Sequence, residues 1–481
     1  MAGSMEATIT DFDGRDTAPP QPAPSLKMDA RTRLLLEAPA LLVLLRLAWP
    51  NILVMMAHSA TGLVELWYVA HLGVEALTAM ALVTPVLILM QNMSQGAMGG
   101  GISSAIARAL GAGQREKADA FVFHSLVICA AFGLFFMVVI LAAGRPLYRL
   151  LGGEGASLDG AVTYSAIIFS GMVLIWIFSA LASIIRGTGN MLVPGLVICG
   201  GLVLLIPLSP CLIFGFGPIP AMGIAGGGVA LLIYYALGTL VLGWYVASGR
   251  NLARFRPVRL RWGPAREILA VGAVGAVNTL QINVTIAGAM ALVAAYSSAA
   301  SVAGLGTGTR LEYLLPPLGF GLGAPLVALV GTNIGAGQGR RALRIALIGG
   351  ALAFALTEAI GIAAAIWPEA WLRLFETDPH VLATGSAYLR TVGPFFGFFG
   401  LGITLYFACQ GAGRLGWPLL GGLLRVITVL GGGWITLRLT GSLSAFFAVY
   451  ASGLIIYGLT IAIPVARGSW FRRPAMADIG R

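Results

Sequence analysis

A single glutamate stands inside an apolar stretch that is long enough to cross a bilayer. Glu65 lies in the second half of the segment from Leu41 to Val69, within the sequence GLVELWYVAHLG. A charged side chain at the centre of a membrane helix costs roughly 2.5–3.5 kcal/mol, so such a residue is a functional-site candidate by default. Desolvation disfavours the ionised form of a carboxyl group, so a carboxyl group inside a membrane can take up and release a proton near physiological pH. We therefore expect Glu65 to couple cation movement; a hydrated or purely structural position is the alternative.

Other polar residues interrupt later apolar stretches. Gln91 and Gln95 are one helical turn apart with Asn92 beside them, and this spacing fits either substrate binding or hydrogen bonding between helices. Asn278, Gln281 and Thr285 share one helical face, whereas Asn283 points nearly opposite. The candidate substrate cavity comprises Tyr68, Gln91, Asn92, Gln95, Tyr164, Gln281, Asn283, Arg310 and Glu312.

Arg310 and Glu312 form the second charged site of interest. They are two residues apart, so on an ideal helix they do not face each other and are expected to contact different partners. Glu312 is the second candidate for cation coupling, with a structural ion pair as the alternative. Glu358 is a weaker third candidate.

The composition identifies the class of protein. Of 481 residues, 58% are hydrophobic and only 10% are charged, which is typical of a polytopic membrane protein. The net charge of +11 is spread in short groups between apolar spans, which argues against nucleic-acid binding. The four cysteines are isolated, and the four histidines form no HExxH motif. We expect no metal site, no cofactor and no enzymatic activity.

Apolar runs predict twelve membrane helices. Their ranges are 40–70, 75–107, 119–143, 160–186, 191–214, 222–247, 265–294, 300–332, 341–367, 381–410, 416–440 and 443–466. Sorting the connections into two alternating sets places 22 of the 30 lysines and arginines on the side of both termini, including Arg186. The positive-inside rule therefore predicts cytoplasmic termini in a plasma (inner) membrane protein. Residues 1–39 are predicted to be a disordered cytoplasmic tail, and 467–481 a second tail.

The chain repeats itself at an offset of 224 residues. LGAGQREKA at 110–118 aligns with IGAGQGRRA at 334–342, and RGTGNMLVP at 186–194 aligns with QGAGRLGWP at 410–418. Six spans fit within the offset, so the two copies enter the membrane from the same side. The predicted fold is all-α, with two parallel six-helix bundles related by a pseudo-twofold axis along the membrane normal. The N-lobe covers 40–247, an Arg-rich linker 248–264 and the C-lobe 265–466.

Four sequence motifs occur in order along the chain: LAWPNIL in the first helix, LVELWYVAHLGVEALTAMAL across the first hairpin, GAGQ after the second and eighth helices, and RGTGN before the fifth. Taken together, they resemble the multidrug and toxic compound extrusion (MATE) family. The resemblance covers essentially everything after residue 40. It implies an efflux transporter working by alternating access, in which the first-helix carboxylate takes up the coupling cation. Glu65 is the residue that matches this position.

Departures from the family pattern shape the expected mechanism. The first-helix pair is Val64-Glu65 where the family usually has Val-Asp, and Asn283 stands roughly where a seventh-helix acid is common. Fewer oxygen ligands favour a proton over sodium as the coupling ion. The resemblance thus implies a monomeric exporter of amphipathic, cationic small molecules, with the lipid bilayer and its substrate as partners.

Two other classes of function fit the sequence less well. A flippase or exporter of a lipid-linked or anionic metabolite would need a basic cavity, for which only Arg46, Arg310, Arg390 and Arg425 lie within spans. A membrane-embedded enzyme lacks support, because no catalytic motif is present. The absence of a GK[ST] loop likewise argues against an ATP-driven pump.

Overall fold

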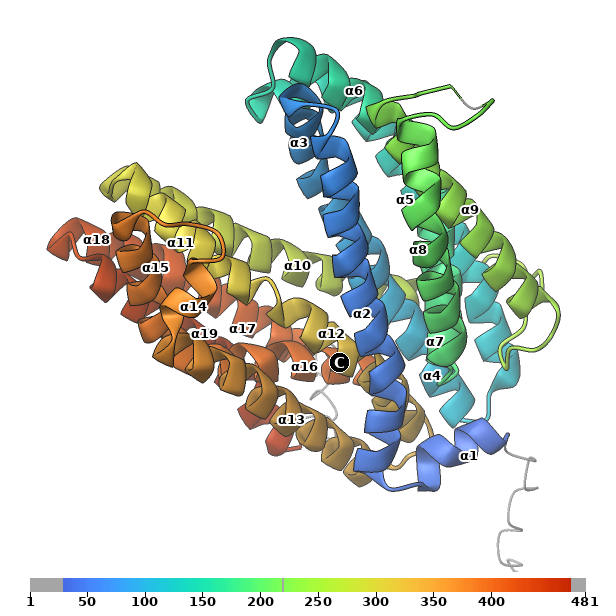
Figure 1. Ribbon diagram of the computed structural model, residues 1–481. Coiled ribbons are helices and arrows are strands. Elements are labelled where there is room, and N and C mark those ends of the chain that lie inside the picture. The colour runs from blue at the N-terminus through green and yellow to red at the C-terminus, as the bar shows by residue number, and fades with distance from the viewer. Residues whose placement is uncertain (1–28, 219, 469–481) are drawn as a thin grey trace, which may run out of the picture.

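The protein is a two-lobed bundle of long helices (Figure 1). The computed structural model describes residues 29–218 and 220–468. Eleven helical segments in this part are long and apolar enough to span a membrane, and the bent pair α6–α7 makes a twelfth. The predicted fold class, twelve membrane helices in two lobes, is therefore confirmed.

The N-lobe contains the first six spans. Its elements are α2 (Ala40–Ala70), α3 (Val74–Asn92), the π-helix η1 (Met93–Met98), α4 (Gly99–Gly111), α5 (Arg115–Leu150), α6 (Gly155–Ser170), α7 (Met172–Gly187), α8 (Leu192–Ile213) and α9 (Ile224–Ala247). The second span is formed by α3, η1 and α4 together, and the fourth by α6 and α7, which meet at an angle of 48°.

The C-lobe repeats this arrangement. Its elements are α10 (Trp262–Tyr296), α11 (Ala299–Glu312), α12 (Leu315–Gly335), α13 (Gly339–Ile366), α14 (Pro368–Leu372), α15 (Pro379–Val392), the 3₁₀ turn η2 (Gly393–Phe395), α16 (Phe396–Ala412), α17 (Gly416–Val426), the π-helix η3 (Ile427–Gly432), α18 (Gly433–Thr440) and α19 (Leu443–Ala466). The eighth span breaks between α11 and α12, just before Pro316 and Pro317. The fourth and tenth spans break at equivalent places, because Gly171 matches Phe395 at the 224-residue offset.

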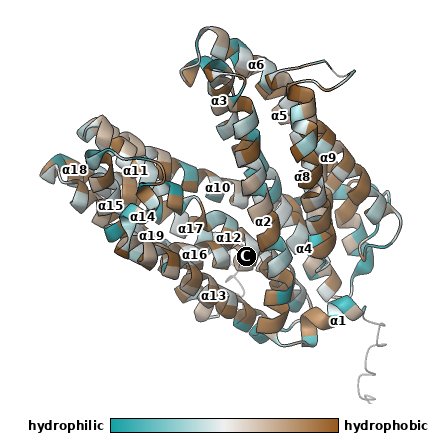
Figure 2. Cartoon of the chain, viewed as in Figure 1, coloured by the Kyte–Doolittle hydropathy of each residue, from teal (hydrophilic) through white to brown (hydrophobic). Residues whose placement is uncertain are grey.

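Apolar side chains cover the lengths of the helices. Figure 2 shows hydrophobic colours along most of them, and hydrophilic colours gather at α1 and in the connections. Leu134, Phe135 and Val138 on α5 are more than half exposed, as expected for side chains that face lipid. Two large buried clusters, one mainly in each lobe, form separate cores.

The lobes meet along a seam built from small residues of α4 and α12. A Cβ added to Gly111 would collide with the carbonyl oxygen of Thr332, and one added to Gly335 would collide with that of Arg108. These two contacts are repeat equivalents of each other. Ala107 and Gly331 are also equivalents and face one another, since a Cβ on Gly331 would lie 2.9 Å from the Ala107 Cβ. The seam is therefore an isologous interface across the pseudo-twofold axis.

From the seam the lobes diverge. In Figure 1 the α3–α6 end of the N-lobe lies far from the α11–α18 end of the C-lobe, while α1 and the start of α2 lie near the joined ends. The connections 112–114 and 336–338, which follow α4 and α12, also lie at the joined ends.

Part of the predicted disordered tail is helical. Helix α1 (Ala30–Glu37) begins at Asp29, whose side chain accepts a hydrogen bond from the Arg31 N–H. Leu35 is buried against the Gly189 turn of the N-lobe, and its carbonyl accepts a hydrogen bond from Asn333 of the C-lobe at 3.1 Å. Burial of one apolar face explains why residues 30–37 are ordered. Residues 1–28 and 469–481 of the predicted tails lie outside the described residues.

The glycines of the seam generate a first prediction. Gly111→Val should destabilise the joined lobes by about 1–3 kcal/mol, because the new side chain overpacks a backbone contact. The measurement is the thermal unfolding temperature in detergent, compared with Gly62→Val. Gly62 lies in α2 with open space around it, so its substitution should leave the temperature nearly unchanged. Equal effects of both substitutions would contradict the close packing of the seam.

Candidate functional site

Glu65 of α2 is a membrane carboxylate with a buried oxygen and no partner for it. The side chain is half-buried, its Oε1 is fully buried, and this atom accepts no hydrogen bond from the described residues. The carboxylate lies close enough to Tyr164 of α6 and Tyr235 of α9 to interact electrostatically with both hydroxyl groups. No lysine or arginine among the described residues forms an ion pair with Glu65. A site of this kind is open to an exchangeable cation or proton.

A hydrogen bond from α3 orients one of these tyrosines. The Gln91 side-chain amide donates to the Tyr235 hydroxyl oxygen at 3.0 Å. Because that oxygen accepts from Gln91, the hydroxyl hydrogen of Tyr235 is free to donate elsewhere, and an ionised carboxylate is a strong acceptor. Glu65, Gln91, Tyr164 and Tyr235 thus bring four spans of the N-lobe to one polar cluster, which we call the N-lobe site.

The C-lobe holds its own buried carboxylate in a different state. Glu312 of α11 is 1% exposed, and its Oε1 accepts a 2.7 Å hydrogen bond from Arg425 of α17. Its Oε2 accepts from the hydroxyls of Tyr388, at 2.9 Å, and Tyr450, at 2.7 Å. Three donors converge on one carboxylate, so both of its oxygens are engaged in hydrogen bonds. The ion pair that sequence reasoning kept as an alternative for Glu312 is present.

Aromatic rings enclose the cationic partner. The Arg425 guanidinium carbon lies 4.7 Å from the Phe399 ring centroid and 6.0 Å from that of Tyr457. Arg425 is 1% exposed, so its buried charge and that of Glu312 stabilise each other. This C-lobe pair links α11 to α17 and, through the tyrosines, to α15 and α19.

The internal repeat relates the two sites. Tyr164, beside Glu65, is the repeat equivalent of Tyr388, which donates to Glu312. Glu65 and Glu312 lie in spans that are not repeat equivalents, the first and the eighth. Each nevertheless lies beside the equivalent tyrosine of its own lobe. The equivalent of Arg425 is Gly201, against which the Tyr234 ring packs. The C-lobe therefore carries a resident cation where the N-lobe has none.

A third polar group lies in the seam. Gln410 donates to the carbonyl oxygens of Gly96, at 3.1 Å, and Ala97, at 3.4 Å, both within η1. The repeat equivalent of Gln410 is Arg186, which extends from the N-lobe toward the C-lobe. Its guanidinium carbon lies 5.7 Å from the ring centroid of Phe320, the equivalent of Gly96. Arg186 is 5% exposed, so its predicted place in a cytoplasmic connection is wrong: α7 continues through it and the C-lobe covers it. Gln95, Arg186 and Gln410 line one small cavity between the lobes.

The remaining predicted residues do not join these clusters. The Tyr68 hydroxyl donates to the Ile206 carbonyl at 3.0 Å, and the Gln281 amide to the Leu419 carbonyl at 3.3 Å. Asn92 is exposed; Asn283 is exposed as well and bonds only to the Thr279 carbonyl of its own helix. Arg310 is exposed, with its guanidinium 5.0 Å from the Phe375 ring centroid. Arg310 and Glu312 do contact different partners.

Glu358 and the four basic residues considered for a flippase lie on different helices and do not form one cluster. The Glu358 carboxylate accepts from the Gly397 N–H at 2.7 Å, which ties α13 to α16. Arg46 lies on α2, Arg310 on α11, Arg390 on α15 and Arg425 on α17, where Glu312 neutralises it. Within the described ranges, no group of three or more His, Cys, Asp or Glu residues is placed to hold a metal ion.

Sequence reasoning missed Tyr235, Gln410 and the pairing of Arg425 with Glu312. Tyr235 lies in an otherwise apolar sixth span, where a tyrosine pair is an ambiguous signal. The repeat offers a clue to Gln410, because it aligns this residue with Arg186 at equivalent helix ends.

A twelve-span protein made of two parallel repeats, with a carboxylate inside a membrane span of each lobe, has the architecture of a secondary transporter. The MatE family model matches residues 50–211 and 276–435, which is more than half of the chain and one match in each lobe. The protein belongs to this family of membrane transporters.

Individual relatives agree with this assignment. The chain is 28% identical to the FAD transporter of Shewanella oneidensis over 78% of its own length and 82% of that protein. It is 26% identical to the "Probable multidrug resistance protein NorM" of Thermotoga maritima, over 77% and 80% of the two chains. Among solved structures, MATE in the bent conformation matches with a TM-score of 0.84 at 22% identity, covering 92% of this chain and 98% of that one. A MATE family transporter in an outward-facing conformation matches with a TM-score of 0.82 at 21% identity, covering 92% and 99%.

The buried C-lobe pair generates a second prediction. Arg425→Met should lower the free energy of unfolding by about 3–5 kcal/mol, because it leaves the Glu312 carboxylate buried without its cation. The double variant Glu312→Gln, Arg425→Met should recover most of that loss, since neither charge remains. Denaturation of the purified variants in detergent measures the difference. A double variant no more stable than Arg425→Met would show that the two charges are not coupled.

Proposed function

We propose that the protein exports amphipathic, cationic small molecules across the plasma membrane in exchange for protons. The observation that carries this proposal is the N-lobe site, where the Glu65 carboxylate has a buried oxygen and no resident cation. Proton and cationic substrate would compete for this carboxylate. Protonation removes the charge that attracts the substrate, and release of the proton restores it.

The asymmetry of the two lobes supports a single coupling site. Glu312 is neutralised by Arg425 and saturated by two tyrosine hydroxyls, so it has no free role in cation exchange. Gly201 leaves the equivalent place in the N-lobe without a cation. One exchangeable carboxylate implies one coupling ion in each transport cycle.

A proton suits the N-lobe site better than sodium. A hard cation prefers several oxygen ligands around it, whereas the neighbours of Glu65 are tyrosine hydroxyls, one of which already accepts from Gln91. With cytoplasmic termini, as the positive-inside rule predicts, the seam lies at the cytoplasmic end and the diverging lobes open outward. Glu65, in the outer half of α2, would then exchange its proton with the outside.

The coupling role of Glu65 generates a third prediction. In membrane vesicles, a proton gradient should drive transport of a fluorescent organic cation by the wild-type protein, and Glu65→Gln should reduce that transport at least tenfold. The reason is that glutamine is a neutral isostere that cannot exchange a proton. Fluorescence change at matched expression measures the rate, under imposed proton or sodium gradients.

Glu75→Gln is the matched control, because Glu75 is an exposed acid of the same lobe in the first turn of α3. It should transport at the wild-type rate. Full transport by Glu65→Gln would refute the coupling role, and transport driven by sodium alone would refute proton coupling.

Single-site coupling generates a fourth prediction. Exchange of one proton for one monovalent organic cation moves no net charge, so a membrane potential should change the final accumulation ratio by less than twofold. Each additional charge moved would contribute about 2.3 kcal/mol per 100 mV, equivalent to roughly 50-fold in that ratio. Potassium gradients with valinomycin set the potential in proteoliposomes. A change near 50-fold at 100 mV would contradict exchange of one proton for one cation.

Export of an anionic metabolite is the second candidate. Its support is the 28% identity to the FAD transporter and the buried Arg186, which has no carboxylate within ion-pair distance among the described residues and lines the cavity between the lobes. Transport of a flavin nucleotide by proteoliposomes, lost in Arg186→Gln but retained in Glu65→Gln, would favour it over cation export.

A further inference from the structure

A cavity of about 540 Å³ lies between the start of α2 and the first turns of α13, at the joined ends of the lobes. We call it the α13 cavity. Its charged lining consists of three arginines of α13, namely Arg340, Arg341 and Arg344. Its apolar lining consists of Pro39, Ala40 and Leu41 around the start of α2, and of Ile348 on α13. None of these residues belongs to the N-lobe site, the C-lobe pair or the seam.

The three arginines have no carboxylate partner. None of them forms an ion pair within the part of the chain that the structure describes. Arg340 and Arg344 are exposed and form no hydrogen bond with a described residue. Arg341 is half-buried: its guanidinium donates to the Ala38 carbonyl oxygen, and its Nε is buried without a partner. The α13 cavity therefore gathers three positive charges without a counter-ion.

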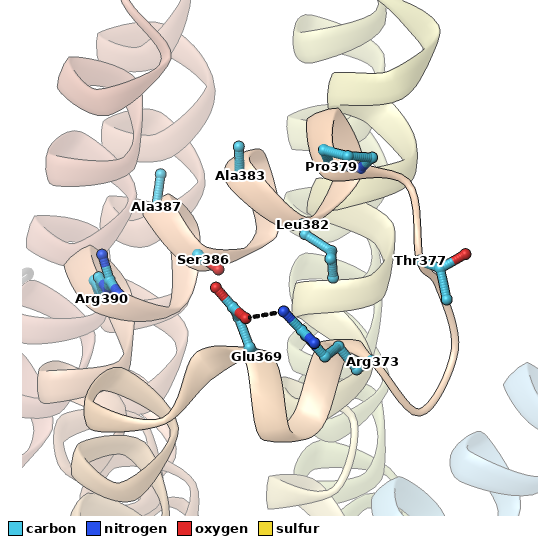
Figure 3. A pocket seen from close by; sticks show the side chains of 9 residues that line it. All are labelled: Glu369, Arg373, Thr377, Pro379, Leu382, Ala383, Ser386, Ala387 and Arg390. Atoms are coloured by element: carbon cyan, nitrogen blue, oxygen red, sulfur yellow. Dashed lines mark ion pairs between the residues drawn. The ribbon is translucent and has the colours of Figure 1, made fainter.

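A cavity at the opposite end of the C-lobe offers a comparison. Figure 3 shows it between α14 and α15, with a 2.7 Å ion pair between Glu369 and Arg373 in its lining. Arg390 is the third charged residue there, so two arginines and one glutamate leave a single positive charge. The α13 cavity differs because no acidic residue lines it.

The equivalent place in the N-lobe carries no positive excess. The repeat equivalents of the three arginines are Glu116, Lys117 and Ala120. Lys117 is already paired, because its Nζ lies 2.8 Å from a carboxylate oxygen of Glu267 on α10. The arginine cluster is therefore not a requirement of the repeated fold.

The linker also covers the equivalent place in the N-lobe. His124, the equivalent of Ile348, accepts a 2.9 Å hydrogen bond from the Arg261 N–H of the segment that precedes α10. The segment that precedes α2 is α1, and it takes another direction, because Leu35 packs against Gly189 of the N-lobe. Figure 1 shows α1 extending from the start of α2 away from α13. The described residues before α2 therefore leave the α13 cavity uncovered.

The arginines lie nearer the membrane surface than the apolar residues. Arg344, the deepest of the three, lies roughly 7.5 Å from the start of α13 at 1.5 Å per residue, and Ile348 lies roughly 13.5 Å from it. Helical side chains lean toward the helix N-terminus, which brings the guanidinium groups closer to water. On the other wall, Arg341 reaches the carbonyl of Ala38, before the first residue of α2, so its guanidinium lies on the water side of Leu41. Charge at the surface with apolar contact below it matches a phospholipid headgroup and its acyl chain.

The charge of the cavity favours one class of headgroup. Basic clusters beside membrane spans attract anionic lipids, and a guanidinium binds phosphate oxygens through two parallel N–H donors. Phosphatidylglycerol has a phosphodiester and no cation of its own. A zwitterionic headgroup would place an ammonium group among three guanidinium groups, with no carboxylate in the lining to receive it.

We propose that the α13 cavity binds an anionic phospholipid from the leaflet on the side of the chain termini. Arg340 and Arg344 bind the phosphate, and Arg341 holds the start of α2 against α13 beside it. The upper acyl chain contacts Leu41 and Ile348. Binding does not depend on the N-lobe site or on the proposed coupling role of that site.

The test is native mass spectrometry of the delipidated full-length protein with equal amounts of phosphatidylglycerol, phosphatidylethanolamine and phosphatidylcholine of identical acyl chains. The wild type should retain phosphatidylglycerol at least fivefold over each of the other two lipids. The double variant Arg340→Gln, Arg344→Gln should retain about tenfold less phosphatidylglycerol than the wild type, because the phosphate loses both of its guanidinium partners.

The matched control is the double variant Arg259→Gln, Arg266→Gln. These arginines lie in the linker and at the start of α10, are exposed and form no ion pair with a described residue. The control removes the same charge from the same end of the molecule and should retain phosphatidylglycerol like the wild type. Both double variants should unfold at the wild-type temperature in detergent, which separates loss of binding from loss of folding.

Free glycerol 3-phosphate at millimolar concentration distinguishes a lipid from a soluble phosphate compound. It should not displace the lipid, since it makes no contact with Leu41 and Ile348. Equal retention of the three lipids, equal retention by the two double variants, or displacement by glycerol 3-phosphate would each overturn the assignment.

Discussion

The cost of holding a charge inside a bilayer governs this molecule. Glu65 of the N-lobe and Glu312 of the C-lobe both lie in membrane spans, and the two carboxylates are stabilised in different ways. In the C-lobe, Glu312 forms an ion pair with Arg425 and accepts hydrogen bonds from two tyrosine hydroxyls. In the N-lobe, Glu65 has tyrosines nearby and no ion pair with a described lysine or arginine, so in the proposed function the cation would come from solution or from the substrate.

The seam holds the two lobes together at one end. Backbones at Gly111 and Gly335 approach so closely that no side chain fits, and Gln410 uses the carbonyl groups of the π-helical turn η1 as acceptors. A π-turn leaves backbone carbonyls without their usual helical partners, so a donor from the other lobe is well matched to it. These contacts are polar or depend on van der Waals fit.

Much of the architecture could be predicted from the sequence, because apolar length and the 224-residue repeat are local or periodic signals. Glu65 could be identified as a candidate for the same reason, because a single acid in an apolar span stands out in the sequence. The pairing of Glu312 with Arg425 could not be predicted, since 113 residues separate them and only the folded C-lobe brings them together. The exposed position of Asn283 could not be predicted either, because it depends on which face of α10 packs against α17. The order of α1 depends on Gly189 and Asn333, which lie in different lobes.

The isologous seam also carries a record of ancestry. An interface in which Ala107 faces Gly331, its own repeat equivalent, is one that two separate six-helix chains could form as a symmetric dimer. In the single chain, the linker of residues 248–264 makes the association of the two halves independent of protein concentration. A dimer of identical six-helix subunits would carry the same residue at both equivalent positions, so Arg425 in one half and Gly201 in the other is a difference that such a dimer cannot have.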